Sequence, residues 1–465
     1  MADALERAYA IAREWFDQLD EMPAGATVTA EIMRARLTAP LPETGMNADT
    51  VIDELATKVN GGLNNAAGGR FFGWVTGGTL PSAVAADWLV SSWDQNGATF
   101  ATSPALAMIE EVTGQWIKEL LDLPRQASFA FTTGCQMAHT TSLAAARHAV
   151  LKAEGWNVED DGLFGAPILR IVTSENRHAS IDRALRYLGI GRNAIYEVAT
   201  DDLGRIQPAG FKAALTELEG PKIAVLNAAD LNVASFDDFA TLIPLANEAG
   251  TWVHIDGAFG LFARASRAKH HLVEGLDLAD SWSVDAHKWL NVPFDCGVAI
   301  IRDGTAHRAA MAQPASYIEP ELDGRDQMDW TMEWSRRGRA IPVYAALREL
   351  GRAGVESMID RCCTHCFNIV TRIGALPCAR ALSIPELNQG LIRFERSNAS
   401  DAENDQFTDD VTYAINATGG AFFTPATWRG MRAMRVSVVN WRTTDKDVDR
   451  AVCSAAKILS AKLAT

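Results

Sequence analysis

Residues that could do chemistry follow short apolar runs in the middle of the chain. The run "TWVHIDGA" carries Asp256, "DSWSVDA" is followed by Lys288, and His178 comes just past "PILRIVTS". Aspartate and lysine are among the residues least often buried without a partner. A small-residue turn, "TTGC", leads into a helical stretch, and the backbone N–H groups at a helix start bind anions such as phosphate. We therefore expect an anion cradle, a carboxylate, an amine and an imidazole at one edge of a sheet.

This set of groups fits pyridoxal 5′-phosphate. Lys288 would form a Schiff base with the aldehyde, and Asp256 would keep a proton on the pyridine nitrogen so that the ring accepts electrons. The helix that starts near residue 135 would hold the phosphate. Each feature alone has a plainer interpretation: Lys288 could snorkel at a sheet edge, Asp256 could lie in a turn, and His178 could be a core histidine. His254, on the strand itself, is assigned to the core. The hypothesis depends on the four features occurring together.

The elements that must position these groups show α/β alternation from about residue 125. We expect strands over 167–174, 221–228, 251–258, 280–286 and 296–303. Their apolar character on both faces is typical of a covered parallel sheet. Helical patterns separate several of them, over 136–153, 209–218 and 236–249. This order predicts an α/β fold with a mostly parallel central sheet flanked by helices, and ligands beyond the carboxyl ends of its strands.

The length of 465 residues predicts more than one domain. We expect an N-terminal helical segment over 1–95, a large domain that binds the cofactor over 96–345, and a small C-terminal α+β domain over 346–465. Within the last domain, strands are expected near 390–396 and 432–439 and a final helix over 444–463.

The charge balance excludes some classes of partner. The net charge of −15, without a basic block, argues against nucleic acid and anionic membranes. The start "MADALERAYAIAREWFDQLD" is an acidic amphipathic helix rather than a signal peptide, and no apolar run is long enough to span a bilayer. We expect a cytoplasmic protein.

The seven cysteines show no disulfide spacing, which favours reduced thiols in the cytosol. The stretch "RCCTHCF" resembles a metal cluster, but it lies in a helical pattern without a matching second cluster. Zinc sites need four ligands held tetrahedrally. We therefore predict helix packing there and no metal.

Several motifs together resemble the group II pyridoxal-phosphate-dependent amino-acid decarboxylases, which include aromatic-L-amino-acid, tryptophan and glutamate decarboxylases. The motifs are "HIDGAFG", "DAHKW", "TTGCQMAH" and "ENRHASIDRALRYLGIG", and the resemblance covers roughly residues 65–450. It implies the fold of type I pyridoxal-phosphate enzymes and a homodimer with shared active sites.

The resemblance also implies roles for individual residues. Lys288 matches the Schiff-base lysine and Asp256 the pyridinium partner, while His178 and Ala258 match the residues on the two faces of the ring. Further cofactor contacts fall on Gly134, Cys135, Gln136, Asp285 and His287. Substrate contacts fall on Trp74, Phe100 and Arg435, with Phe100 supplied by the second subunit.

The implied reaction is decarboxylation of an L-amino acid, with an aromatic side chain, to the amine and CO2. The alternatives are a decarboxylation-dependent oxidative deaminase that yields an aldehyde, another carbon–carbon lyase of this cofactor, and a non-catalytic protein that binds the cofactor. Retention of Lys288, Asp256 and His178 argues against the last.

The chain departs from the family pattern in three places. The phosphate turn reads Cys135-Gln136, without the usual hydroxyl. In "NAADLNVASFDD", Ala229, Val233 and Ala234 replace glycines and threonines, and alanine resists positive φ, so a different loop path is expected. Gln327 falls where aromatic decarboxylases carry a mobile tyrosine that protonates Cα, and the nearest tyrosine is Tyr317.

Overall fold

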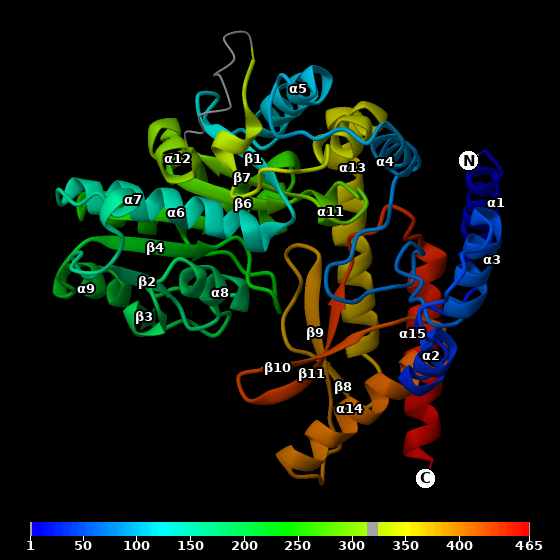
Figure 1. The fold of residues 1–465 in the computed structure, drawn as a ribbon. Helices are drawn as coiled ribbons and strands as arrows, with labels where there is room; N and C mark the ends of the chain where they lie inside the picture. Colours follow the sequence, from blue (N-terminus) through cyan, green and yellow to red (C-terminus); the bar gives the residue numbers. More distant parts are fainter. Residues whose placement is uncertain (1, 314–323, 465) are drawn as a thin grey trace. The chain divides into compact units, whose positions relative to one another are not determined.

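The computed structural model describes residues 2–313 and 324–464 (Figure 1). Two compact units make up the chain. The central unit comprises Thr79–Thr364 and Pro385–Gln389, and the terminal unit comprises Met1–Gly78, His365–Ile384 and Gly390–Thr465. Tyr317 lies outside the described residues.

The central unit is built on a seven-stranded sheet with the strand order β1-β7-β6-β5-β4-β2-β3 (Figure 1). The strands are β1 (Ser128–Thr132), β2 (Arg170–Ser174), β3 (Ile195–Val198), β4 (Lys222–Asn227), β5 (Trp252–Asp256), β6 (Ser281–Asp285) and β7 (Gly297–Ile301). Neighbours from β6 to β3 pair in parallel, whereas β7 runs antiparallel to both β6 and β1. The predicted mostly parallel sheet is confirmed.

The strand predicted over 296–303 was expected in the parallel set, and that expectation was wrong for β7. The connection from β6 to β7 runs over residues 286–296 and contains only the short helix α11 (Ala286–Trp289). A parallel return needs a crossover of a dozen or more residues, usually a full helix. The short connection therefore returns the chain as an antiparallel neighbour.

Helices cover the inner strands of the sheet: β5, β6 and β7 are buried at every residue, whereas the edge strand β3 is partly exposed. Helix α6 (Cys135–Ala153) crosses one face, and α8 (Ala179–Tyr187) and α12 (Gly304–Met311) pack beside it. Ile223 and Val225 of β4 join the core under α6 and α8. Alternation turns Ala224 and Leu226 to the opposite face, and α9 (Pro208–Glu217) and α10 (Phe239–Glu248) pack together against other strands of the sheet.

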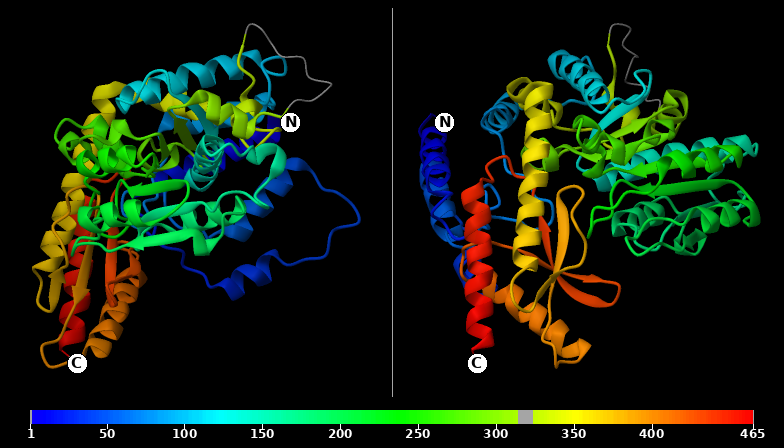
Figure 2. Two further views of the ribbon diagram at one scale, coloured as in Figure 1. Left: turned by 90° about the vertical axis from the view of Figure 1, so that its left-hand side faces the viewer. Right: turned by 180° about the vertical axis from the view of Figure 1, so that it is seen from behind.

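The central unit has further helices before, within and after the part of its sequence that forms the sheet. They are α4 (Pro81–Trp93), α5 (Pro104–Leu120), α7 (Val158–Asp161), and the first part of α13 (Ala340–Gly374), which changes direction at Gly351. Short 3₁₀ turns span Arg192–Ala194, Gly260–Ala265, His270–Val273, Leu276–Leu278 and Gln327–Trp330. Figure 2 shows this unit from two further sides.

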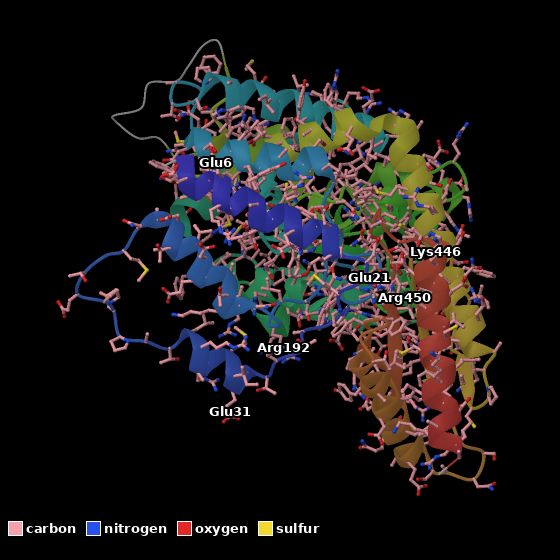
Figure 3. All side chains as sticks on the ribbon, turned by 90° about the vertical axis from the view of Figure 1, so that its right-hand side faces the viewer. Glu6, Glu21, Glu31, Arg192, Lys446 and Arg450 are labelled. Carbon is pink, nitrogen blue, oxygen red and sulfur yellow. The ribbon has the colours of Figure 1, made fainter. Side chains whose placement is uncertain are left out.

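The terminal unit combines helices from both ends of the chain with a four-stranded sheet of order β10-β11-β9-β8. Its helices are α1 (Ala2–Gln18), α2 (Ala30–Leu37), α3 (Ala48–Val59), α14 (Asp401–Ala417) and α15 (Asp445–Leu463), with the end of α13. Its strands are β8 (Ala379–Ala381), β9 (Gln389–Phe394), β10 (Thr424–Trp428) and β11 (Met431–Ser437). Arg450 of α15, labelled in Figure 3, lies near the N-terminal helices. It donates a hydrogen bond of 2.9 Å to the Asp20 carbonyl and so ties the two ends of the chain together.

The final helix α15 begins where the sequence predicts it, whereas α14 was not predicted, and both helices carry capping boxes. Ser400 accepts from the Glu403 N–H at the start of α14, and Thr444 accepts from the Asp447 N–H at the start of α15. In each case the acidic side chain bonds back to the cap residue, so orphan N–H groups are satisfied. The predicted strands near 390–396 and 432–439 are confirmed as β9 and β11, while β8 and β10 were not predicted.

Candidate active site

Two aspartates end neighbouring parallel strands. Asp256 is the last residue of β5 and pairs in register with Ser283, and Asp285 is the last residue of β6. The carboxyl ends of parallel strands meet at one edge of a sheet. The helix α11 follows directly and places Lys288 one turn after Asp285, so the lysine returns toward the same edge.

Asp285 joins three elements. One of its oxygens, Oδ2, lies 3.0 Å from Lys288 Nζ, and the other, Oδ1, accepts the Cys135 N–H at 2.6 Å. Burial by itself lowers the pKa of Lys288, but the Asp285 carboxylate more than offsets this and raises it above its ordinary value. Lys288 is thus protonated and held between α11 and the first residue of α6.

His287 completes this side of the site. Its Nδ1 accepts the Cys296 N–H at 3.2 Å, and its Nε2 lies 3.6 Å from Asp285 Oδ1. Burial lowers the pKa of His287 below its ordinary value despite the nearby carboxylate. The neutral ring therefore carries its hydrogen on Nε2, toward Asp285.

The turn into α6 is shaped by Gly134. Its φ of +147° is disfavoured for other residues, and a Cβ there would lie 3.3 Å from His287 Cε1 and 3.5 Å from Asp285 Oδ1. Next to it, Cys135 is buried, and burial, followed by Asp285 and Asp256, raises the pKa of its thiol well above the ordinary value. Among the described residues, Gln136 Nε2 is buried without a hydrogen-bond partner.

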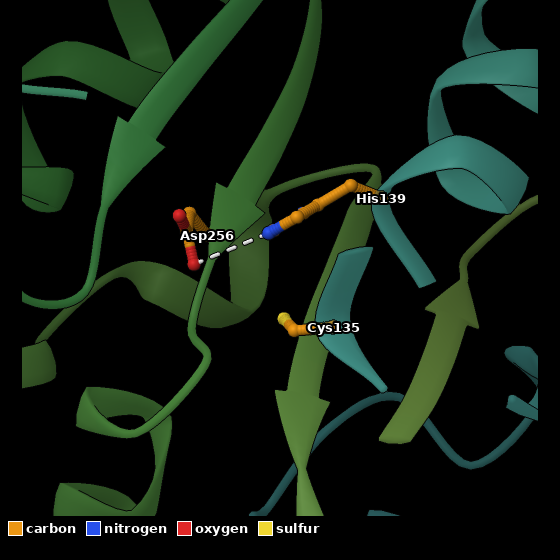
Figure 4. A group of neighbouring side chains, drawn as sticks. All are labelled: Cys135, His139 and Asp256. Carbon is orange, nitrogen blue, oxygen red and sulfur yellow. Dashed lines mark ion pairs between the residues drawn. The ribbon is translucent and has the colours of Figure 1, made fainter. Parts of the chain in front are cut away.

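Asp256 is the second anionic centre of the site (Figure 4). Its Oδ1 lies 3.5 Å from His139 Nε2 and accepts the Ala258 N–H at 3.2 Å. Burial alone would raise the pKa of Asp256, but His139, His178 and Lys288 act against it, and the pKa is lower than usual. The carboxylate therefore stays ionised although it is only 7% exposed.

His178 caps a helix at the same edge. It precedes α8, and its Nδ1 lies 2.6 Å from Ser180 Oγ and accepts the Ser180 N–H at 3.2 Å. It is exposed, yet it is close enough to lower the pKa of Asp256. The structure thus brings the predicted cofactor residues of the central unit to one edge of the sheet.

The predicted substrate residues are more dispersed along the chain. Phe100 belongs to the central unit, where its N–H donates to Asp326 Oδ1 at 2.8 Å. Trp74 and Arg435 belong to the terminal unit. Trp74 is 56% exposed and its ring lies 5.6 Å from that of Phe422, while Arg435 stands on β11. Their roles stay predictions.

The loop after β4 corrects one expectation. Ala234 adopts φ +55°, although alanine was expected to avoid positive φ. Local bonds hold this conformation: Asp230 Oδ1 accepts the N–H groups of Asn232 and Val233, and the Ala234 N–H donates to the Asp230 carbonyl. These bonds offset the strain of a left-handed alanine, which is of the order of 1 kcal/mol.

The cysteine stretch lies in helix α13, as the sequence predicts. Cys362, Cys363 and Cys366 are buried in the helix, and burial raises the pKa of Cys362 and Cys363. All seven cysteines are free thiols.

Among the described residues, no helix has the length and apolar character needed to cross a bilayer.

Two histidines of the site were missed by the sequence reasoning. His139 stood inside a quoted motif without a role, and His254 was assigned to the core. Their spacing carried a usable signal. His139 lies four residues after Cys135 on α6, and His254 lies two residues before Asp256 on β5, so each shares a face with a predicted site residue.

Comparison with known proteins identifies the family. The conserved domain of the pyridoxal-dependent decarboxylases matches residues 31–394. The chain belongs to this family. Pyridoxal 5′-phosphate is therefore its cofactor, and its enzyme class is that of the carboxy-lyases.

Three curated relatives of this decarboxylase differ in activity. An aromatic-L-amino-acid decarboxylase of Bacillus atrophaeus is 25% identical, over 93% of this chain and 90% of the relative. An L-2,4-diaminobutyrate decarboxylase of Rhizobium meliloti is 28% identical, over 79% and 73%. A 4-hydroxyphenylacetaldehyde synthase of Rhodiola rosea is 25% identical, over 75% and 71%.

The fold is also similar to solved structures. The crystal structure of Oryza sativa TDC with PLP and tryptamine superposes with a TM-score of 0.91 at 20% identity, covering 99% of this chain and 97% of that one. The predicted type I architecture is thereby confirmed.

The residues of the site fit the cofactor. An ionised Asp256 suits a protonated pyridine nitrogen, and Lys288 provides the amine. The helix start, the space that a Cβ at Gly134 would fill, and the unpartnered Gln136 amide provide donors and room for a phosphate.

Proposed function

We propose that this decarboxylase removes CO2 from an L-amino acid with an aromatic side chain and releases the amine. The observation that carries the proposal is the meeting of Lys288, Asp285 and the start of α6 at the sheet edge that also holds the ionised Asp256. The aromatic preference follows the aromatic-L-amino-acid decarboxylase relative, which matches 93% of the chain. The diaminobutyrate decarboxylase makes short basic side chains the second substrate group to test.

We assign each cofactor-binding residue to the part of the cofactor that it would contact. Lys288 would hold the aldehyde carbon, and Asp256 the pyridine nitrogen. Ala258 and His178 would lie on the two faces of the ring. The phosphate would lie among Gly134, Cys135, Gln136, Asp285 and His287.

The chemistry needs little from the protein beyond charge and orientation. When bound, the cofactor supplies an electron-withdrawing ring that accepts the electron pair left on Cα as CO2 departs. Asp256, ionised and buried, favours the protonated form of the ring nitrogen. Residues that hold the substrate select the bond that breaks by its orientation, and we assign this task to Trp74, Phe100 and Arg435.

We further propose a cytoplasmic homodimer with shared active sites. In it the N-terminal segment 1–95 packs on the partner subunit, 96–345 binds the cofactor, and 346–465 forms the small domain. Phe100 would reach the active site of the second subunit. The seven free thiols support a reducing compartment.

An aldehyde is the second candidate product, and Gln327 motivates it. This residue is 2% exposed, and its side-chain nitrogen and oxygen lack hydrogen-bond partners among the described residues. A glutamine delivers no proton to Cα. Oxygen could then accept two electrons and two protons to give peroxide, while water supplies the carbonyl oxygen and ammonia leaves. The aldehyde synthase relative supports this candidate.

A panel of amino acids with the purified holoenzyme tests both candidates. We expect CO2 and amine with aromatic substrates, together with an aldehyde fraction and peroxide in air that disappear under nitrogen. Gln327→Tyr should shift the products toward amine. Amine alone in air, unchanged by Gln327→Tyr, would rule out the aldehyde candidate, and release of no CO2 from any substrate would rule out the decarboxylase proposal.

A further inference from the structure

Behind Asp256 lies a continuous chain of buried polar groups. Trp252 Nε1 donates to Ser281 Oγ at 3.0 Å, and Ser281 Oγ lies 2.9 Å from His254 Nδ1. His254 Nε2 lies 2.9 Å from His139 Nδ1, and His139 Nε2 faces Asp256 Oδ1 at 3.5 Å (Figure 4). His139, His254 and Ser281 are fully buried. The mechanism proposed above uses only the last member, Asp256.

The fold builds this chain from two strands and one helix. Trp252, His254 and Asp256 alternate along β5 and so share the face beneath α6. Ser281 of β6 is the register partner of His254, and His139 comes from α6 above. The row of buried polar groups is therefore held by regular secondary structure rather than by a flexible loop.

The direction of the hydrogen bonds can be derived from their ends. The indole of Trp252 can only donate, so Ser281 Oγ accepts there, and the Ser281 hydroxyl hydrogen can point to His254 Nδ1; the Asp256 end decides whether it does. Burial lowers the pKa of both His139 and His254, so each ring is neutral and carries one hydrogen.

With Ser281 donating to Nδ1, His254 carries its hydrogen on Nε2 and donates to His139 Nδ1. His139 must then carry its hydrogen on Nε2, toward the carboxylate. The reverse order would point a ring lone pair at ionised Asp256, which is unfavourable. All four donors therefore point the same way.

We infer that His139 is a positioning residue that presents its Nε2–H to Asp256 and so holds the carboxylate ionised and oriented. The groups behind it fix which ring nitrogen of His139 carries the hydrogen. This inference rests on the proposed role of Asp256 at the pyridine nitrogen. At 3.5 Å the last link is long for a hydrogen bond, so its effect is chiefly electrostatic.

A metal ion is the competing explanation for these groups. Ligand atoms of Cys135, His139 and Asp256 all lie within 4.8 Å of one another. However, metals bind the thiolate, and the raised pKa of Cys135 keeps its thiol protonated. His139 offers only Nε2, since its Nδ1 is occupied by His254. The hydrogen-bond chain accounts for the orientation of His139 without an ion.

The first test measures cofactor affinity rather than turnover. Pyridoxal 5′-phosphate is removed from the holoenzyme and titrated back, with the visible absorbance of the lysine-bound cofactor as the signal. His139→Phe keeps a ring without donors and should weaken binding at least about tenfold. His139→Gln keeps an N–H donor on a side chain of similar reach and should restore affinity to within about threefold of wild type.

Two further variants separate positioning from packing. Ser281→Ala removes the donor to His254 without touching Asp256 and should weaken binding by about two- to fivefold. His307 is a matched control, because it is buried and its ring nitrogens contact Ser128 Oγ and the Trp330 carbonyl. His307→Phe should lower the thermal midpoint and leave cofactor affinity unchanged.

The second test reads the hydrogen directly. Nitrogen-15 spectra of histidine-labelled protein should show His139 as the neutral Nε2–H form in the wild type, and as a mixture of both neutral forms in Ser281→Ala. Equal losses of affinity for His139→Phe and His139→Gln, or an Nδ1–H form in the wild type, would overturn the inference. One equivalent of metal in the wild-type holoenzyme, absent from His139→Gln, would overturn it in favour of an ion site. Failure of the wild type to bind the cofactor would instead refute the proposed function, whereas weakened binding in Asp256→Asn alone would refute only the role of His139.

Discussion

Asp256 and Asp285 end neighbouring parallel strands, and each is faced by the Nε2 of a neutral histidine, at 3.5 Å and 3.6 Å. They differ in what else surrounds them. Asp285 has a close cation in Lys288 and the N–H of Cys135. Asp256 has one backbone donor and weaker electrostatic support from His139, His178 and Lys288. The same strand-end geometry thus yields one carboxylate neutralised within the protein and one that can still serve an external cation.

The largest expected effect follows from removing the cation of this comparison. Lys288→Ala should lower turnover by at least about a thousandfold, because no amine remains at the site. Borohydride treatment of the wild type and peptide mapping should place the cofactor on Lys288.

Lys118 provides a stringent control for that experiment. It is also buried, and burial lowers its pKa to about 8, so it is the more readily deprotonated amine. A label on Lys118 would mean that reactivity rather than the geometry around Asp285 selects the lysine.

The two aspartates should respond differently to the same substitution. Asp256→Asn removes the charge that we propose lies opposite the ring nitrogen and should lower turnover by about a hundredfold or more, since each pKa unit is worth about 1.4 kcal/mol. Asp285→Asn keeps an oxygen for the Cys135 N–H and should cost about tenfold or less. Turnover and cofactor affinity of both variants provide the measurement, and equal losses would erase the distinction drawn between the carboxylates.

The buried neutral histidines predict acid sensitivity. The pKa values of His139, His254, His287 and His307 are all lowered, that of His307 to about 3. The unfolded chain takes up these protons near pH 6.5 and the folded chain does not, so stability falls as pH falls below about 6.5, by up to about 1.4 kcal/mol per pH unit for each group.

Asp237 changes the pH dependence of the folding stability in the opposite direction. Burial raises its pKa to about 6, so between about pH 6 and about pH 4 the folded state binds the additional proton and one group's loss is offset. Urea midpoints from neutral to mildly acidic pH measure the balance, and His307→Gln should reduce the slope. A pH-independent midpoint would show that these histidines are protonated in the folded state.

The smallest effect concerns the thiol between the carboxylates. Cys135 is buried with a raised pKa, whereas Cys453 is exposed. Iodoacetamide should modify Cys453 first and Cys135 at least about a hundredfold more slowly. Asp285→Asn removes one source of the raised pKa and should modestly accelerate Cys135. Mass spectrometry of the labelled peptides gives both rates, and prior labelling of Cys135 would contradict the described electrostatics.

Much of the site could be predicted from the sequence because the ends of the strands can be recognised there. The runs that lead to Asp256 and Lys288 are apolar and short, so their carboxyl ends could be assigned and brought to one edge. The antiparallel direction of β7 could not be predicted from its apolar run, because such a run is the same in either direction. Only the short connection over 286–296 indicates the direction. The positive φ of Ala234 could not be predicted either, because it depends on hydrogen bonds to Asp230 that are specific to this loop. His139 was overlooked because a histidine inside a helix has many ordinary explanations.

The polar chain beneath α6 also bears on engineering. His139, His254 and Ser281 are fully buried polar side chains on elements that also carry the apolar core beneath α6. Exchanging such buried polar groups for well-packed apolar ones often makes a protein more stable. A search for heat-resistant variants that scores folding alone would therefore tend to select replacements at these three positions. Libraries built on this enzyme should hold the three positions fixed, or screen for cofactor retention at the same time as thermal stability.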